Sequence, residues 1–248
     1  MLPENYSMIC LLETGSWTAL ISGYCPAEAS AVLHEMKLEG VNMDPVTVAS
    51  ILPVCAQLDD TVSGMLIHLY VVKNGLEFDL VVSNNLIYMY AKFGIPGHAL
   101  RFFDKMVVRD IVSWNSIIAA YEQNNDPIHA HGFFNEMQRF GVQPDSLTLV
   151  SLASIVAQLN DCQSSRSVHG FIMRRDWLME DVVIGNAVVD MDAKLGVLGF
   201  ARAVFEGLPI KDVISWNTLI TGYAQSGYVS EAIQVYQMME EYTEIMPN

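Results

Sequence analysis

The feature that most constrains this chain is a ten-residue segment that occurs three times. Residues 16–25 read SWTALISGYC, residues 113–122 read SWNSIIAAYE, and residues 215–224 read SWNTLITGYA. The copies lie about 100 residues apart, which is too long for one helical hairpin, so each period must contain smaller units. A chain with repeats of this kind folds by stacking similar units, each of which contacts mainly its neighbours.

Smaller repeats divide each period into three parts. Residues 83–94 (SNNLIYMYAKFG) match 185–196 (GNAVVDMDAKLG), and residues 46–60 (VTVASILPVCAQLDD) match 147–161 (LTLVSLASIVAQLND). Residues 1–13 match no other segment and are predicted to form a divergent N-terminal cap. The rest of the chain is predicted to form seven units of 31 to 36 residues: 14–44, 45–79, 80–110, 111–145, 146–181, 182–212 and 213–248.

Each unit is predicted to form two helices, as the unit at 111–145 illustrates. Four apolar residues have the i, i+3, i+4, i+7 spacing of one helix face: Trp114, Ile117, Ile118 and Tyr121. A polar break at 123–126 precedes Pro127, which suits the first turn of a second helix. That helix has its own apolar stripe: Phe133, Phe134, Met137 and Phe140. Because stacked hairpins share a core that one hairpin cannot provide, the predicted fold class is all-α, an α-solenoid of about seven helix-turn-helix repeats.

The composition limits the class of protein and the cellular compartment that this fold can belong to. Hydrophobic residues make up 52% of the chain, which excludes a disordered protein. No apolar run reaches the roughly 20 residues that span a bilayer, so we expect no membrane partner. The N-terminus resembles neither a secretory signal nor an organellar transit peptide. The cysteines have no C-x-x-C spacing, which favours free thiols in a reducing compartment: Cys10, Cys25, Cys55 and Cys162.

The sequence has no recognisable catalytic motif. It contains neither H-x-E nor C-x-x-C, the signature of zinc-dependent base deaminases. His129 and His131 are two residues apart and so face different sides of a helix, which disfavours a metal site. Walker, GxGxxG and G-x-S-x-G motifs are also missing. We therefore expect a protein that is not an enzyme, with no catalytic residue, metal, cofactor or small-molecule substrate.

The motifs SWN…GY, L-x-x-L-x-M-Y-A-K-x-G and F-x-x-M…G-V-x-P-D resemble those of pentatricopeptide repeat (PPR) proteins. The cycle of unit lengths is similar to the plant P-L-S subclass, with P units at 14–44 (shortened), 111–145 and 213–248. The L units would be 45–79 and 146–181, and the S units 80–110 and 182–212. This resemblance covers residues 14–248 and implies a right-handed superhelix that binds single-stranded RNA, one base per repeat.

The resemblance also implies which side chains select each base, because in the family the fifth and last residues of a unit act together. Three units carry the Asn–Asp pair that favours U: Asn84 with Asp110, Asn115 with Asp145, and Asn186 with Asp212. Thr18 with Asp44 is a pair that favours G. Asn217 with Asn248 is a pair that favours a pyrimidine, C before U. The L units have pairs that fit no reliable code: Ala49 with Asp79, and Val150 with Asp181. The implied register is G-?-U-U-?-U-Y.

In the family, an aliphatic second residue of each unit sandwiches the base. Four residues are implied in this role: Val81, Val112, Val183 and Ile214. The first unit has Gly15 at this position, which cannot sandwich a base. Packing of the helix start is the alternative explanation of the aliphatic residues, and both explanations remain open.

The chemistry of the fifth and last residues agrees with base reading. Asn is unfavourable inside helices, yet it recurs one turn into the first helix of four units, where its amide offers both a donor and an acceptor to a pyrimidine edge. The alternative for the terminal Asp is N-capping of the following helix, and one Asp can serve in both roles.

The charge argues against nucleic acid. The net charge is −15, with 13 basic and 28 acidic residues, whereas nucleic-acid binders gain much of their affinity from Lys and Arg. The leading hypothesis is nevertheless an RNA-binding adaptor for RNA processing in a plant mitochondrion or chloroplast, the mitochondrion preferred. C-to-U editing is the implied process, and an editing deaminase or editing cofactor proteins are the implied protein partners.

Two alternatives to this hypothesis stay open. One is a protein-binding helical scaffold, which the acidic charge favours. The other is a truncated fragment that does not bind RNA alone. The fragment is suggested by four residues missing between Cys25 and Pro26 relative to the seventh unit.

Overall fold

The computed structural model of the chain describes residues 19, 31–32, 35–36, 39–40, 42–173 and 181–245. The predicted cap at 1–13, together with Gly15, Thr18 and Asn248, lies outside these residues. Residues 42–173 and 181–245 form twelve α-helices and one 3-10 helix, without strands, which confirms the predicted all-α fold class. The chain divides into two compact structural units, each made of several repeats. Unit 1 is residues 1–124 and unit 2 is residues 125–248, and the two are described separately.

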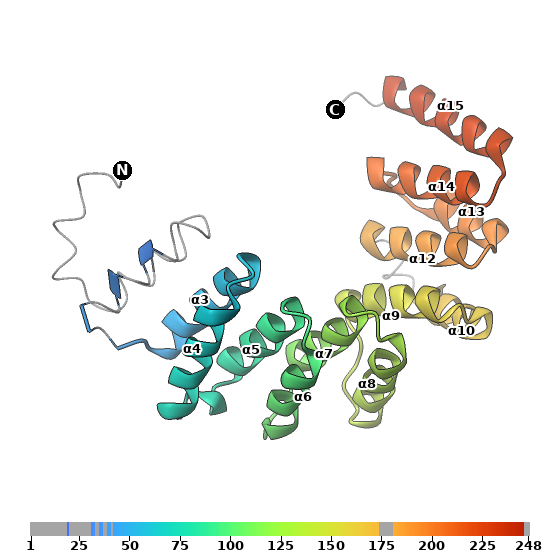
Figure 1. The fold of residues 1–248 in the computed structure, drawn as a ribbon. Helices are drawn as coiled ribbons and strands as arrows, with labels where there is room; N and C mark the ends of the chain where they lie inside the picture. The colour runs from blue at the N-terminus through green and yellow to red at the C-terminus, as the bar shows by residue number, and fades with distance from the viewer. Residues whose placement is uncertain are drawn as a thin grey trace, which may run out of the picture. The chain divides into compact units, whose positions relative to one another are not determined.

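Unit 1 consists of two layers of helices (Figure 1). Helix α5 packs between α3 and α7 in one layer, and α4 and α6 pack against α3 and α5 as the second helices of two hairpins. The bounds are α3 Pro45–Gln57, α4 Thr61–Lys73, the 3-10 helix Leu76–Phe78, α5 Leu80–Lys92, α6 Pro96–Lys105 and α7 Ile111–Gln123.

Unit 2 repeats this arrangement. Helix α12 packs between α9 and α14, while α8, α10, α13 and α15 form the second layer (Figure 1). The bounds are α8 Pro127–Arg139, α9 Ser146–Leu159, α10 Cys162–Met173, α12 Val182–Lys194, α13 Leu198–Gly207, α14 Val213–Gln225 and α15 Val229–Ile245. None of the described helices is long and apolar enough to cross a membrane.

Each first helix that the structure describes begins immediately after an aspartate that caps it. In each case one carboxylate oxygen accepts a hydrogen bond from a backbone N–H of the first turn, with N···O distances of 2.7 to 2.9 Å. The capping residues are Asp44, Asp79, Asp110, Asp145, Asp181 and Asp212. These bonds satisfy donors that the helix leaves unpaired, so the same local sequence sets the start of six helices.

Several hairpin turns contain a residue with a positive φ, and one of them is the predicted break before Pro127. Asn125 has φ +57° in the polar break before α8, and α8 begins at Pro127 as predicted. After α5 and α12, Gly94 and Gly196 have φ +72° and +73°, a conformation that glycine adopts without strain.

The core lies between the two layers. All four residues of the predicted stripe in α7 are buried: Trp114, Ile117, Ile118 and Tyr121. In α8 the prediction holds for Phe134 and Met137, which are buried, but it is wrong for Phe140. Phe140 occupies the C-cap position and is 64% exposed, because the helix ends before its side chain can reach the core.

The same aromatic contact recurs in both units. The Phe103 and Trp114 rings lie 4.9 Å apart, edge to face, and the Phe205 and Trp216 rings lie 4.8 Å apart in the same geometry. A cation covers the phenylalanine in each case, Arg109 in unit 1 and Lys211 in unit 2. Each contact fastens the second helix of one hairpin to the first helix of the next.

Candidate functional site

The second residue of every described first helix is an exposed aliphatic side chain. Their exposed fractions range from 51% to 68%. Four are the residues predicted to sandwich bases (Val81, Val112, Val183 and Ile214), and the two repeats predicted to be L-type contribute Val46 and Leu147. Burial in the core therefore does not explain why this position is aliphatic, and the side chains are accessible to a ligand.

Two of the predicted asparagine–aspartate pairs are brought into contact. Asn186 on α12 donates from Nδ2 to Oδ1 of Asp212, the cap of α14, at 3.2 Å. In unit 1, Asn84 on α5 makes the equivalent hydrogen bond to Asp110, the cap of α7. Each pair thus joins the first helices of consecutive hairpins.

Both asparagines carry an unsatisfied oxygen. Asn84 and Asn186 are 9% and 8% exposed, and the Oδ1 atom of each is buried without a hydrogen-bond partner. A buried polar atom left unpaired costs about 1–3 kcal/mol. The same arrangement recurs at the equivalent place in the two hairpins.

The remaining predicted pairs are not seen together. Asn115 lies in unit 1 (residues 1–124) and its partner Asp145 in unit 2 (residues 125–248), so their relative position is not described. Asn217 is exposed, and its partner lies outside the described residues, as does Thr18, the partner of Asp44. In the two repeats predicted to be L-type, the residues at positions 49 and 150 are half-buried, and their paired aspartates cap the next helix.

The two capping aspartates that contact an asparagine, Asp110 and Asp212, have lowered pKa values. Burial raises the pKa of Asp212, but hydrogen bonds from the Ser215 backbone, the Ser215 hydroxyl and the Asn186 amide outweigh it, so the pKa lies below its usual value. The pKa of Asp110 is lowered by the same balance of burial against hydrogen bonds from Ser113 and Asn84. The asparagine of each pair therefore helps to keep its aspartate ionised.

The lowered pKa values predict how stability depends on pH. A carboxyl whose pKa is lower in the folded than in the unfolded chain stabilises the fold while it is ionised. We therefore expect the free energy of unfolding to be at its full value above about pH 5 and to fall as the pH drops through about 4, measured by urea denaturation. Asp212→Asn keeps a good N-cap but removes the titrating group. The variant should therefore lose less free energy of unfolding than the parent chain over the same pH range. An equal loss in both proteins as the pH falls through this range would contradict this account.

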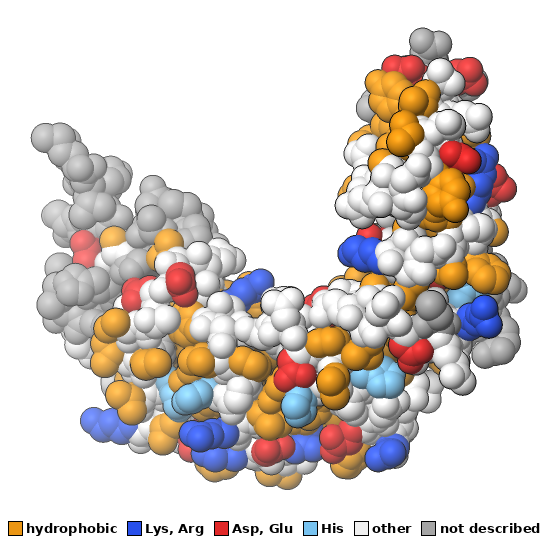
Figure 2. All heavy atoms as spheres, turned by 45° about the vertical axis from the view of Figure 1, so that its right-hand side comes forward, with side chains coloured by type: hydrophobic (Ala, Val, Ile, Leu, Met, Phe, Trp, Pro, Cys, Tyr) orange, Lys and Arg blue, Asp and Glu red, His pale blue; other side chains and the backbone are white. Residues whose placement is uncertain are grey.

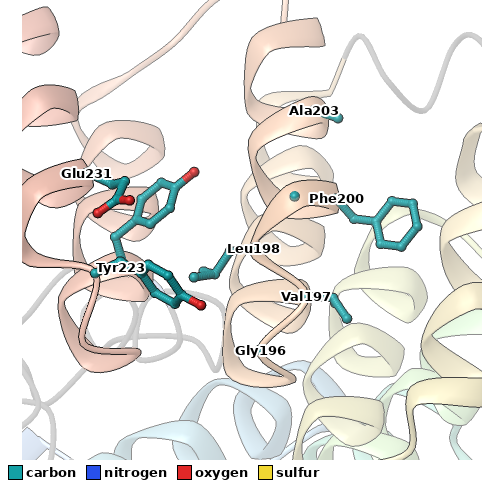
Figure 3. Close-up of a pocket in the computed structure, with 9 residues that line it drawn as sticks. Gly196, Val197, Leu198, Phe200, Ala203, Tyr223 and Glu231 are labelled. Carbon is teal, nitrogen blue, oxygen red and sulfur yellow. The ribbon is translucent and has the colours of Figure 1, made fainter.

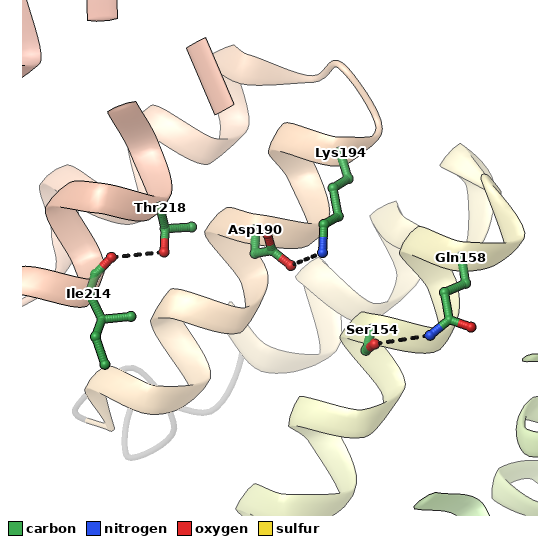
Figure 4. Close-up of polar contacts among 6 residues, drawn as sticks. All are labelled: Ser154, Gln158, Asp190, Lys194, Ile214 and Thr218. Atoms are coloured by element: carbon green, nitrogen blue, oxygen red, sulfur yellow. Dashed lines mark hydrogen bonds and ion pairs between the residues drawn. The ribbon is translucent and has the colours of Figure 1, made fainter. Parts of the chain in front are cut away.

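A row of hydrogen-bond donors lies on the same helices and was not predicted. The thirteenth residue of each described first helix is an exposed Gln or Lys: Gln57, Lys92, Gln123, Gln158, Lys194 and Gln225. Figure 4 shows two of them in unit 2, where Lys194 contacts Asp190 at 2.7 Å and Gln158 contacts Ser154 at 3.3 Å. An alignment of the units by their capping aspartates would have found this row.

The largest cavity described, about 710 Å³, lies elsewhere in unit 2. It is broad and mostly apolar, and it lies between α13 and the hairpin α14–α15, where Tyr223 and Glu231 face Leu198 (Figure 3). Within the described residues, no three His, Cys, Asp or Glu side chains are grouped so as to hold a metal ion. The cavity offers apolar contact and little acid–base chemistry.

Comparison with known sequences identifies the repeats. Residues 81–111 and 214–242 match the profile of the PPR repeat, and residues 109–154 match that of the PPR repeat family. These segments of the chain are therefore similar to pentatricopeptide repeats. A pentatricopeptide repeat-containing protein of Arabidopsis thaliana is 52% identical over 240 residues, which are 95% of this chain and 29% of that protein. A chloroplastic one from the same plant is 35% identical over 94% of this chain and 29% of its own length.

The chain therefore spans about a third or less of these two curated PPR relatives. Among solved structures, it is similar to the PPR protein PPR10 in complex with an 18-nt psaJ RNA element, at 19% identity and a TM-score of 0.59. That match covers 93% of this chain and 40% of the other. The crystal structure of PPR10 from maize gives the same TM-score, 0.59. The likeness establishes a shared helical-repeat fold.

Proposed function

We propose that the chain is a sequence-specific adaptor that binds single-stranded RNA and has no catalytic activity of its own. The observation that carries this proposal is the Asn–Asp contact between consecutive first helices, flanked by exposed aliphatic residues. A base stacked between two such aliphatics, Val183 and Ile214 for example, would bring its edge to the Asn186 amide.

The proposed register is G-?-U-U-?-U-Y, read from the pairs given above. The similarity to a PPR protein solved with an RNA element supports RNA as the ligand class. Relatives whose names place them in the chloroplast or the mitochondrion support an organelle, and we propose the mitochondrion first. Within the P-L-S subclass, the process we propose is C-to-U editing, with the deaminase supplied by a partner or by another part of the protein.

The acidic net charge limits how the chain could bind RNA. The net charge is −15, and Lys and Arg side chains are scattered among hydrophobic and acidic ones on the face shown in Figure 2. Non-specific attraction to phosphates is therefore weak, and affinity must come from base contacts and from donors such as the thirteenth-residue row. We expect a shallow dependence of affinity on salt.

A protein-binding scaffold is the second candidate, and one surface favours it. Helix α4 exposes an apolar stripe at i, i+3, i+4, i+7 and i+10: Val62, Met65, Leu66, Leu69 and Val72. The equivalent helix α10 has Gln163, Arg166 and Ser167 at the first three of these positions, so the fold does not require apolar residues there. An exposed stripe of this kind is typical of a surface that binds another protein.

An RNA-binding assay separates the two candidates. We expect the chain to bind a short RNA containing G-N-U-U-N-U-C at least about tenfold more tightly than the same RNA with its three U positions changed to A, measured by fluorescence anisotropy. Equal affinity for both RNAs, or no measurable affinity for either, would contradict coded RNA binding. The second outcome would leave the scaffold as the better explanation.

A further inference from the structure

In unit 2, a buried polar cluster occupies the position that is equivalent to an aromatic ring in unit 1. In unit 1, the Tyr90 hydroxyl on α5 lies 2.6 Å from Nδ1 of His68 on α4. The Tyr90 ring is stacked on His98 and on Phe102 of α6, with centroid distances of 5.2 and 5.9 Å. These contacts fill the space between the three helices.

The corresponding residue on α12 is Asp192. It is 1% exposed, and its Oδ1 accepts a hydrogen bond of 3.1 Å from the Ser165 hydroxyl. Its Oδ2 lies 3.1 Å from Nδ1 of His169, which matches His68 in unit 1. The carboxylate thus keeps the contact to histidine but has no ring to fill the space.

The missing ring leaves a cavity of about 190 Å³ between α10, α12 and α13. Gly170 and Val197 form part of its wall. Phe200, which matches the His98 that stacks on Tyr90, also lines the cavity and is 50% exposed. The Phe200 ring lies 5.6 Å from the His169 ring in a tilted arrangement, and it has no tyrosine to stack on as its counterpart does in unit 1.

We propose that this cavity binds a phenolic ring, supplied by a small phenol or by a tyrosine side chain of a partner. An apolar cavity of about 150 Å³ is large enough for benzene, so the volume suffices for one ring. The ring would stack on Phe200, and its hydroxyl would donate to Asp192, whose oxygens each have two lone pairs. This inference does not depend on RNA binding.

The test uses the 248-residue chain with phenol, toluene and N-acetyltyrosinamide as probes, followed by NMR shifts of Gly170 and Val197. We expect phenol to bind with a Kd on the order of 1 mM, a value within reach of so small a ligand, and toluene to bind more weakly because it cannot donate. Binding of N-acetyltyrosinamide identifies a tyrosine side chain as the source, and binding of phenol alone identifies a small molecule.

Two variants decide whether the cavity is the site. Asp192→Tyr restores the residue found in unit 1 and fills the space, so it should abolish binding of both phenolic probes. Phe200→Ala changes a half-exposed side chain and should weaken binding several-fold without unfolding the chain. Binding that is unchanged in both variants, or that is absent in the parent chain, would overturn the proposal.

Discussion

Replacing Trp114 with alanine is expected to destabilise the chain by about 3–5 kcal/mol, the cost of removing a large buried aromatic side chain. Trp114 is 1% exposed and packs edge to face on Phe103 at 4.9 Å. Arg109 lies over both rings, with its guanidinium carbon 4.4 Å from the Phe103 centroid and 5.9 Å from that of Trp114. Removing the indole therefore opens a cavity and breaks the contact between α6 and α7.

The matched control is Val112→Ala, two residues earlier on the same helix. Val112 is exposed, so its loss should change the free energy of unfolding by no more than about 0.5 kcal/mol in urea denaturation followed by circular dichroism. The same control should weaken RNA binding if Val112 sandwiches a base. Similar losses of stability in the two variants would contradict the assignment of these positions to core and surface.

The fold was predictable because its determinants are local and repeated. The apolar stripe of α7 follows helical spacing, Asn125 and Pro127 mark the turn, and a terminal aspartate precedes each described first helix. Phe140 was predicted to belong to the buried stripe of α8 but is exposed at its C-cap. The reason is that spacing alone does not reveal where a helix ends.

The site was only partly predictable. The sequence identifies Asn186 and Asp212 by their phase in the repeat, but their hydrogen bond depends on how consecutive hairpins stack. Helix α4 is apolar on both faces, so periodicity could not separate its buried Ile67 from its exposed Leu66. The exchange of a tyrosine in unit 1 for Asp192 is visible in the sequence, whereas the cavity that results is a property of packing among three helices.

Exchanging Asn186 for threonine is expected to change which base the sixth repeat prefers. By resemblance to the family, Asn with Asp favours U, and Thr with Asp favours G. Asp212 would still cap α14 through Ser215, so the helix start and the aspartate stay in place while the amide is replaced by a hydroxyl. The matched control is Asn135→Thr, the same substitution at an exposed position of the second helix α8.

The most direct measurement is the affinity of the chain and of Asn186→Thr for four RNAs that differ only at the sixth base of the register. The parent chain and Asn135→Thr should bind the U-containing RNA most tightly, and Asn186→Thr should bind the G-containing RNA most tightly. Preference at the third and fourth bases should be the same in all three proteins. An Asn186→Thr protein that still prefers U, or a parent chain that binds all four RNAs alike, would contradict base reading by the Asn186–Asp212 pair.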